Sequence, residues 1–291
     1  MNHISNFFLV PFQEFIFMRH ALVACLALAL GCGPVGVLLV LRRMSLMGDA
    51  LSHAVLPGAA LGFLISGLSL YAMTLGGIAV GLAVAILAGA VARTTVLRED
   101  ASFAALYLIS LALGVLIICK RGSNVDLIHV LFGTILAVDD AALILVASIT
   151  TATLFTLAVI YRPLIVECFD PGFLKAVGGR GAMMHFIFLV LVVLNLVAGF
   201  TALGTLMAVG MLMLPAASAS FWARQFWSTS LVAMAIAVFS SFVGLLLSFH
   251  MDIPSGPSII LTAGLCYVFS VGFGAHGGLY SRRALGDHLT G

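Results

Sequence analysis

RRMSLMGDALSHAVLPGAALGFLISGL, residues 42–68, is an apolar stretch that carries two metal-binding side chains. Asp49 and His53 stand four residues apart, which places them one above the other on the same face of an α-helix. A carboxylate and an imidazole suit a divalent transition metal such as zinc, manganese or iron. Ionisable groups inside a membrane cost about 2.5–3.5 kcal/mol each, so such a pair indicates function. We therefore predict that Asp49 and His53 bind metal, against the alternative that they only cap or solvate a helix end.

Pro57 and two glycines follow this pair. Proline has no N–H to donate to the carbonyl of His53, so a kink and a free main-chain oxygen are expected beside the two ligands. Gly58 and Gly62 form a GxxxG spacing, which lets a neighbouring helix approach closely. The alternative for Pro57 is a purely structural role, because membrane helices tolerate proline.

The composition of the whole chain requires a membrane. Of its 291 residues 63% are hydrophobic and 8% are charged, whereas soluble domains have about 25% charged residues. A net charge of +2 and the lack of a basic patch argue against a nucleic-acid partner. Five scattered cysteines without a CxxC argue against a disulfide framework. The sequence holds no GxxxxGK[ST], HExxH or GxSxG motif, so it is not expected to be an enzyme or to bind ATP by a phosphate loop.

Nine stretches are apolar and long enough to cross a bilayer, which takes about 20 residues. They cover residues 20–41, 48–68, 71–92, 101–119, 140–161, 183–200, 203–223, 227–249 and 257–275. Residues 1–18 are predicted as an interfacial or re-entrant segment. The prediction is an all-α polytopic membrane protein with about 8–9 transmembrane helices. A cytoplasmic C-terminus puts most of the basic loop residues inside.

Three connections carry further predictions. Residues 162–182 mix apolar and charged side chains and end in a glycine cluster, which favours a short amphipathic helix on the cytoplasmic surface where a partner docks. Residues 120–139 have an apolar middle and are expected to dip into the protein or lie at the interface. His250 and Asp252 lie in a rigid turn and could contact an incoming ion or a docked partner; a plain turn at a helix end is favoured.

LRRMSLMGDALSHAVLPGAALGF, residues 41–63, resembles the signature of the permease subunits of bacterial ABC importers for zinc, manganese and ferrous iron, the ABC-3 family. GDALSH followed by PG is a long and specific string. The resemblance extends over nearly the whole chain and in the expected order. Its further segments are PFQEFIFMRHALVA (11–24), YRPLIVECFDPGFLKAVG (161–178), LGTLMAVGMLMLPAASA (203–219) and DIPSGPSIIL (252–261).

The resemblance implies an importer-permease fold in a single transmembrane permease domain over residues 1–291. The permease would form a homodimer with the path at its axis, bind two copies of a separate ATP-binding subunit inside, and receive metal from an extracytoplasmic metal-binding protein. Asp49 and His53 match the side chains that contact the metal. The segment that matches the coupling helix in the ATPase groove holds Glu167, Phe169, Asp170 and Gly178.

The expected function is therefore the import of zinc, manganese or ferrous iron across the bacterial cytoplasmic (inner) membrane. No cofactor is expected to be held permanently, because the metal is the cargo. One carboxylate and one imidazole from each copy would form a transient site, weak enough to release its ion. The alternative is a stand-alone secondary metal transporter or channel, which would work without an ATPase.

Overall fold

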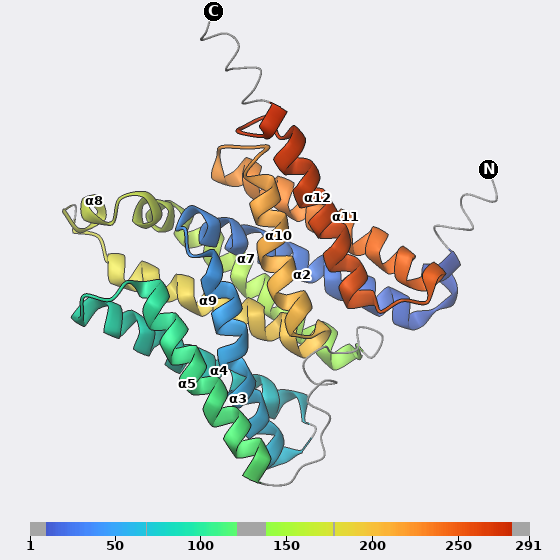
Figure 1. The fold of residues 1–291 in the computed structure, drawn as a ribbon, viewed down its shortest axis with the longest axis horizontal. Helices are drawn as coiled ribbons and strands as arrows, with labels where there is room; N and C mark the ends of the chain where they lie inside the picture. Colours follow the sequence, from blue (N-terminus) through green and yellow to red (C-terminus); the bar gives the residue numbers. More distant parts are fainter. Residues whose placement is uncertain (1–9, 68, 121–137, 177, 281–291) are drawn as a thin grey trace, which may run out of the picture.

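The computed structural model describes residues 10–67, 69–120, 138–176 and 178–280. This part of the chain is helical throughout, apart from its turns. The helices are α2 (Ile16–Leu41), α3 (Ser45–Ser66), α4 (Leu70–Thr94), α5 (Glu99–Lys120), α7 (Asp140–Phe169), α8 (Pro171–Ala176), α9 (Gly181–Leu203), α10 (Thr205–Ala219), α11 (Phe226–Met251) and α12 (Ser255–Phe273). Figure 1 shows them gathered into one bundle, with α3, α4 and α5 together on one side.

Within the described residues, eight helices are long and apolar enough to cross a membrane: α2, α3, α4, α5, α7, α9, α11 and α12. This confirms the predicted all-α membrane fold and all but one of the predicted spans. The exception is the 203–223 stretch, where α10 has only 15 residues. At 1.5 Å per residue it is about 22 Å long, short of the roughly 30 Å hydrocarbon layer.

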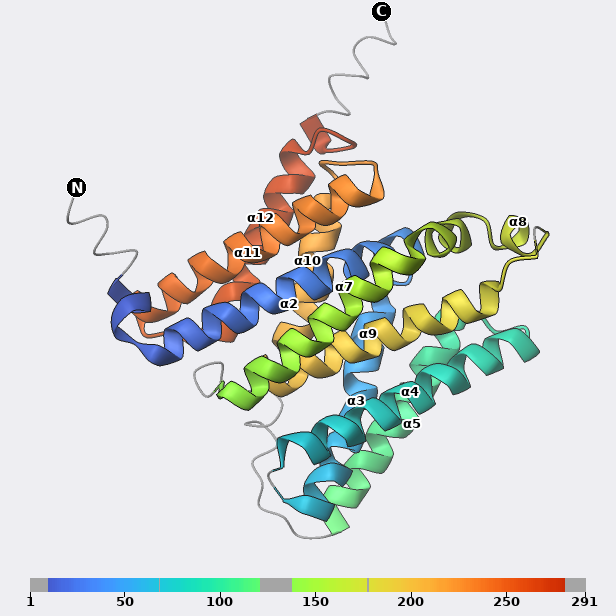
Figure 2. The same ribbon diagram turned by 180° about the vertical axis from the view of Figure 1, so that it is seen from behind.

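α10 follows α9 directly after a turn at Gly204. Gly204 adopts a φ of 92°, which ends α9 and starts α10 at the next residue. The two helices then run back along each other, since Gly199 of α9 lies against Ala208 of α10. Trp222, just beyond α10, donates to the hydroxyl of Ser270 near the end of α12 at 2.8 Å. The end of α10 therefore lies beside the C-terminal end of α12, so α10 brings the chain back across the bundle although it is short (Figure 2).

Several predicted boundaries also shift. The first span begins at Ile16 instead of residue 20, so it takes in the end of the segment predicted as interfacial; residues 1–9 lie outside the described part. α7 continues through Pro163 to Phe169, beyond the predicted end at residue 161. Burial of Leu164, which is 1% exposed, outweighs the one backbone bond that proline removes. The predicted 120–139 connection lies mostly outside the described residues.

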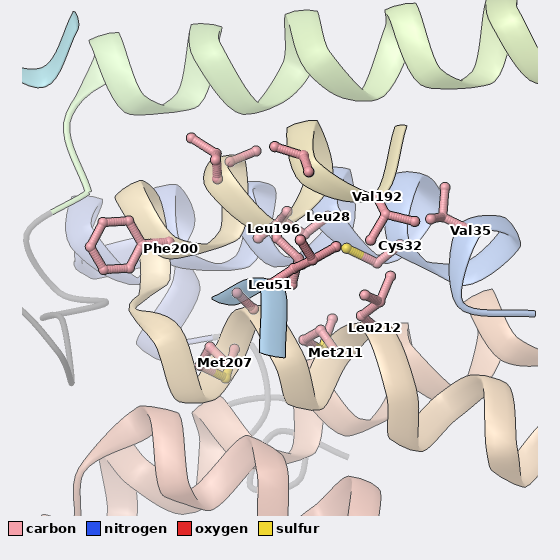
Figure 3. Close-up of a cluster of buried hydrophobic side chains, with 14 of the residues drawn as sticks. Leu28, Cys32, Val35, Leu51, Val192, Leu196, Phe200, Met207, Met211 and Leu212 are labelled. Carbon is pink, nitrogen blue, oxygen red and sulfur yellow. The ribbon is translucent and has the colours of Figure 1, made fainter. Parts of the chain in front are cut away.

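α2 and α9 form the centre of the bundle, where they meet α3 and α10. In each of these two helices, 72% of the most apolar stretch is buried, a larger share than in any other spanning helix of the described residues. Figure 3 shows their side chains interlocking around Leu51 of α3. The labelled members are Leu28, Cys32, Val35, Leu51, Val192, Leu196, Phe200, Met207, Met211 and Leu212, none more than 6% exposed.

α3 packs against α4 at the predicted GxxxG spacing. A Cβ atom added to Gly58 would collide with the carbonyl group of Gly76, and one added to Gly62 would collide with the carbonyl group of Ala72. The backbones therefore touch here, as small residues at a membrane helix interface allow. This contact fixes the helix that carries Asp49 and His53.

Gly58→Ala is expected to lower the melting temperature of the purified permease, because the added methyl group meets a backbone carbonyl that cannot move aside cheaply. Overpacking of this kind costs about 1–3 kcal/mol. Gly264→Ala is the matched control, because no atom lies within 4 Å of a Cβ at that helical position. Equal melting temperatures for the two variants, measured by a thermal shift assay in detergent, would contradict the packing described here.

Candidate metal site

The predicted pair lies on one face of α3. The Nε2 atom of His53 is 3.7 Å from the Oδ1 atom of Asp49. The two side chains are 36% and 62% exposed in the single chain, although both neighbours of Asp49 in the helix, Gly48 and Ala50, are buried. The face that holds both potential ligands is therefore open, while the adjoining faces of α3 are packed.

α5 braces α3 beside the pair. The ring of Tyr107 stacks on the His53 imidazole, with centroids 6.2 Å apart and planes at 30°. The buried hydroxyl of Ser110 donates to the carbonyl of Ala54 at 3.2 Å. A Cβ at Gly114 would lie 2.7 Å from the Pro57 ring, so α5 passes directly over that proline. α3 continues as one helix through Pro57 to Ser66, and α5 supports it on the C-terminal side of His53.

One chain supplies two side-chain ligands at this place. Across residues 10–67, 69–120, 138–176 and 178–280, no three His, Cys, Asp or Glu side chains are grouped so that they could hold a metal ion. A transition metal takes four or more donors in most protein sites. The pair on α3 therefore supplies about half of the usual donors for a metal ion, and main-chain oxygens, water or another chain would have to supply the rest.

His250 and Asp252 lie at the end of α11, on a different element from the pair. The Nδ1 atom of His250 is 2.9 Å from the carbonyl oxygen of Leu246. Asp252 ends the helix in the left-handed conformation, with φ 53°, which aspartate tolerates better than most residues. Both residues are exposed in the turn before α12.

The predicted coupling segment is a short helix between two capped ends. Asp170 ends α7, and its Oδ1 atom accepts from the backbone N–H of Phe173 at 2.8 Å, which starts α8. Gly178 adopts a φ of 78° after α8, as a chain reversal requires. Phe169 and Phe173 project from this segment, 69% and 57% exposed. The predicted helix and turn are present, but α8 has only six residues because α7 takes up part of the expected connection.

A cluster of polar side chains that the sequence did not reveal lies where α2, α5, α7 and α9 meet. The Nη1 atom of Arg42 is 2.6 Å from the Nδ1 atom of His185. The Nε2 atom of His185 is 2.8 Å from Glu99 Oε1, and the Arg42 Nε–H donates to the Cys168 sulfur at 3.1 Å. We call Arg42, Glu99, Cys168 and His185 the arginine cluster. Its members are far apart in sequence, so no spacing motif could have found it.

Comparison with known proteins places this arrangement in a family. The model of the ABC 3 transport family matches residues 14–274. A manganese import system permease protein, ScaB of Streptococcus parasanguinis, is 35% identical over 263 residues, 90% of this chain and 92% of that protein. A probable iron transport system membrane protein of Haemophilus influenzae is 32% identical over 269 residues, 92% of this chain and 97% of that protein.

Solved structures agree with these sequence relatives. PsaBC from Streptococcus pneumoniae, solved in complex with Fab, superposes with a TM-score of 0.82 at 32% identity, covering 96% of this chain and 98% of that chain. A putative metal-chelate type ABC transporter in an inward-facing conformation gives a TM-score of 0.67 at 17% identity, covering 86% of this chain and 84% of that chain. The second likeness concerns the fold alone.

Tyr107→Ala is expected to weaken metal binding by the permease about two- to tenfold, because the His53 ring loses the stacking partner that orients it. Such aromatic pairs contribute about 0.5–1.5 kcal/mol. Tyr107→Phe keeps the ring and serves as the control, with binding near wild type. Isothermal titration of the reconstituted complex with Mn²⁺ measures both. Equal affinity in the alanine and phenylalanine variants would refute a role for the stack.

Proposed function

Since this chain belongs to the ABC 3 transport family, we propose that Asp49 and His53 form the half-site through which it passes a divalent metal ion. The chain is the multi-pass membrane permease of a bacterial ABC importer of manganese or iron. It is not itself an enzyme, because the ATPase is a separate subunit. The observation that carries the site proposal is the open face of α3, where a carboxylate and an imidazole lie 3.7 Å apart.

Manganese or iron is the proposed cargo. Relatives across nearly the full length are named as manganese or iron permeases. Carboxylate and imidazole together are compatible with both metals, and with the zinc that the ligand types also allow. Two side-chain donors hold an ion weakly, and weak binding is what a transport site needs in order to release it.

A second copy of the chain completes the proposed site. Each chain brings one Asp49–His53 pair on an exposed face, so two copies facing each other across a shared axis supply two carboxylates and two imidazoles. Homo-oligomers of this kind most often have twofold symmetry, which places equivalent residues opposite each other. The proposed path therefore runs between the two copies.

Two further partners are proposed at the two ends of the path. Two ATP-binding subunits dock on the segment around α8, where Phe169 and Phe173 are exposed beside Asp170. An extracytoplasmic metal-binding protein delivers the ion at the other end, near the turn of His250 and Asp252. This arrangement puts α8 and the C-terminus in the cytoplasm and the chain in the bacterial cytoplasmic membrane, as the distribution of basic residues favours.

A stand-alone secondary transporter, the alternative drawn from the sequence, is disfavoured by the family. The two functions differ in one observable property. A permease of an ABC importer is inactive without its ATPase, whereas a secondary transporter works alone on an ion gradient.

Asp49→Ala and His53→Ala are each expected to reduce manganese uptake by at least about tenfold in cells that also carry the ATPase and the binding protein. Loss of one ligand in each copy removes half of the donors that replace the hydration shell of the ion. His276→Ala is the matched control, because His276 is exposed and uses its backbone N–H to bond Phe221. The assay is radiolabelled manganese and iron uptake at equal permease abundance. Normal uptake in both site variants would show that the ion takes another route.

Replacing Phe169 and Phe173 together by alanine is expected to abolish co-purification of the ATPase, because truncation of central aromatic anchors costs about 2 kcal/mol or more each. The control is the double variant of Phe155 and Phe239, which are 71% and 56% exposed on α7 and α11, away from α8. Retention of the ATPase by the Phe169/Phe173 variant, measured by affinity pull-down in detergent, would contradict docking at this segment.

A further inference from the structure

The arginine cluster ties together the elements on either side of α8 and the start of α3. Arg42 caps the end of α2 and is separated from Ser45, the first residue of α3, by two residues. Its guanidinium lies 4.4 Å above the Phe188 ring of α9 and bonds to Cys168 at the end of α7. One side chain therefore joins the helix before α8, the helix after α8 and the turn that leads to Asp49 and His53.

The hydrogen-bond directions within the cluster are determined by its chemistry. Arginine can only donate, so the Nδ1 atom of His185, 2.6 Å from Arg42 Nη1, must carry a lone pair. The proton of the neutral ring then lies on Nε2, which is 2.8 Å from Glu99 Oε1, although that oxygen has no hydrogen-bond partner of good geometry. The result is a row of close polar contacts from a cation through a neutral imidazole to a carboxylate, with His185 only 8% exposed.

Glu99 links the arginine cluster to a second helix that contacts α3. It is the first residue of α5, the helix that braces α3 through Ser110 and Gly114. A shift of α7 and α9 therefore reaches α3 twice, through the backbone after Arg42 and through α5. The turn after Arg42 is already strained, because Arg43 has a φ of 58° without being glycine.

The cluster also has room to rearrange. It borders a cavity of about 470 Å³ that Glu167 lines as well. Among the described residues, three buried side-chain atoms of residues that line this cavity have no hydrogen-bond partner: Nη2 of Arg42, Oε1 of Glu99 and Oε2 of Glu167. Unused donors and acceptors that line one cavity can adopt a second pairing when the helices move.

We propose that Arg42 is a positioning residue for transport, which transmits movement of the α7–α8–α9 segment to α3 and thereby changes the exposure of the Asp49–His53 pair. This inference rests on the proposed function, because it supplies the connection between ATPase docking and the metal half-site. It predicts that loss of the Arg42 contacts separates ATP hydrolysis from metal movement without preventing either docking or metal binding.

Arg42→Gln tests the inference in the full complex, reconstituted with its ATPase and binding protein in proteoliposomes. The expected result is continued ATP hydrolysis with manganese uptake per ATP reduced by about tenfold or more. Arg43→Gln removes the same charge from the neighbouring, exposed position outside the cluster. Its ratio of manganese uptake to ATP hydrolysis should stay within about twofold of the wild-type ratio. Arg42→Lys retains the charge but lacks the planar donors, so its ratio should fall between the two.

The outcomes separate the inference from the proposed function. A wild-type ratio in Arg42→Gln overturns the inference, whereas absence of ATP-dependent uptake in the wild-type complex overturns the proposed function. A purely structural role would lower hydrolysis and uptake together and leave their ratio unchanged, which also overturns the inference. If the Arg42→Gln complex does not assemble, the same ratio of uptake to hydrolysis is measured in Glu99→Gln. This variant removes the carboxylate of the arginine cluster and keeps Arg42.

Discussion

The close contact of α3 with its neighbours is the constraint on which the rest of the structure depends. Gly58 and Gly62 bring its backbone against α4, while Gly114 of α5 passes over Pro57. A helix held on these faces leaves one face free, and that face carries Asp49 and His53. In a membrane, where apolar surfaces gain little by meeting each other, such small-residue packing is what can fix a helix in place.

The proposed metal site on α3 and the proposed docking segment around α8 are distant along the chain, and packing connects them. α8 is joined covalently to α7 and α9, and α9 is one of the two most enclosed helices. The arginine cluster adds polar contacts of fixed direction where these helices meet the α2–α3 turn. Rigid helices joined by a few rearrangeable contacts are the physical requirement for moving one end of a protein by acting on the other.

Much of the helical fold and the closeness of Asp49 to His53 could be predicted from the sequence, because hydropathy and short sequence spacings are local properties. The spans followed from apolar length, and the closeness of Asp49 and His53 followed from their four-residue separation on a helix. The observed α10 starts at Thr205, after the turn at Gly204, and ends at Ala219, before the predicted residue 223. α7 was predicted too short because the helix continues through Pro163 to the buried Leu164 and beyond. The contact of Arg42 with His185 joins residues 143 positions apart, a pairing that only the folded bundle creates.

The most direct test of the proposed metal site is to look for an imidazole nitrogen bonded to the transported ion. Pulsed electron paramagnetic resonance of the reconstituted permease complex loaded with Mn²⁺ detects imidazole nitrogen bonded to the metal. We predict a ¹⁴N coupling in the wild type that disappears in His53→Gln and persists in His276→Gln. A Mn²⁺ spectrum without nitrogen coupling in the wild type, or one unchanged in His53→Gln, would contradict the assignment of the site to α3.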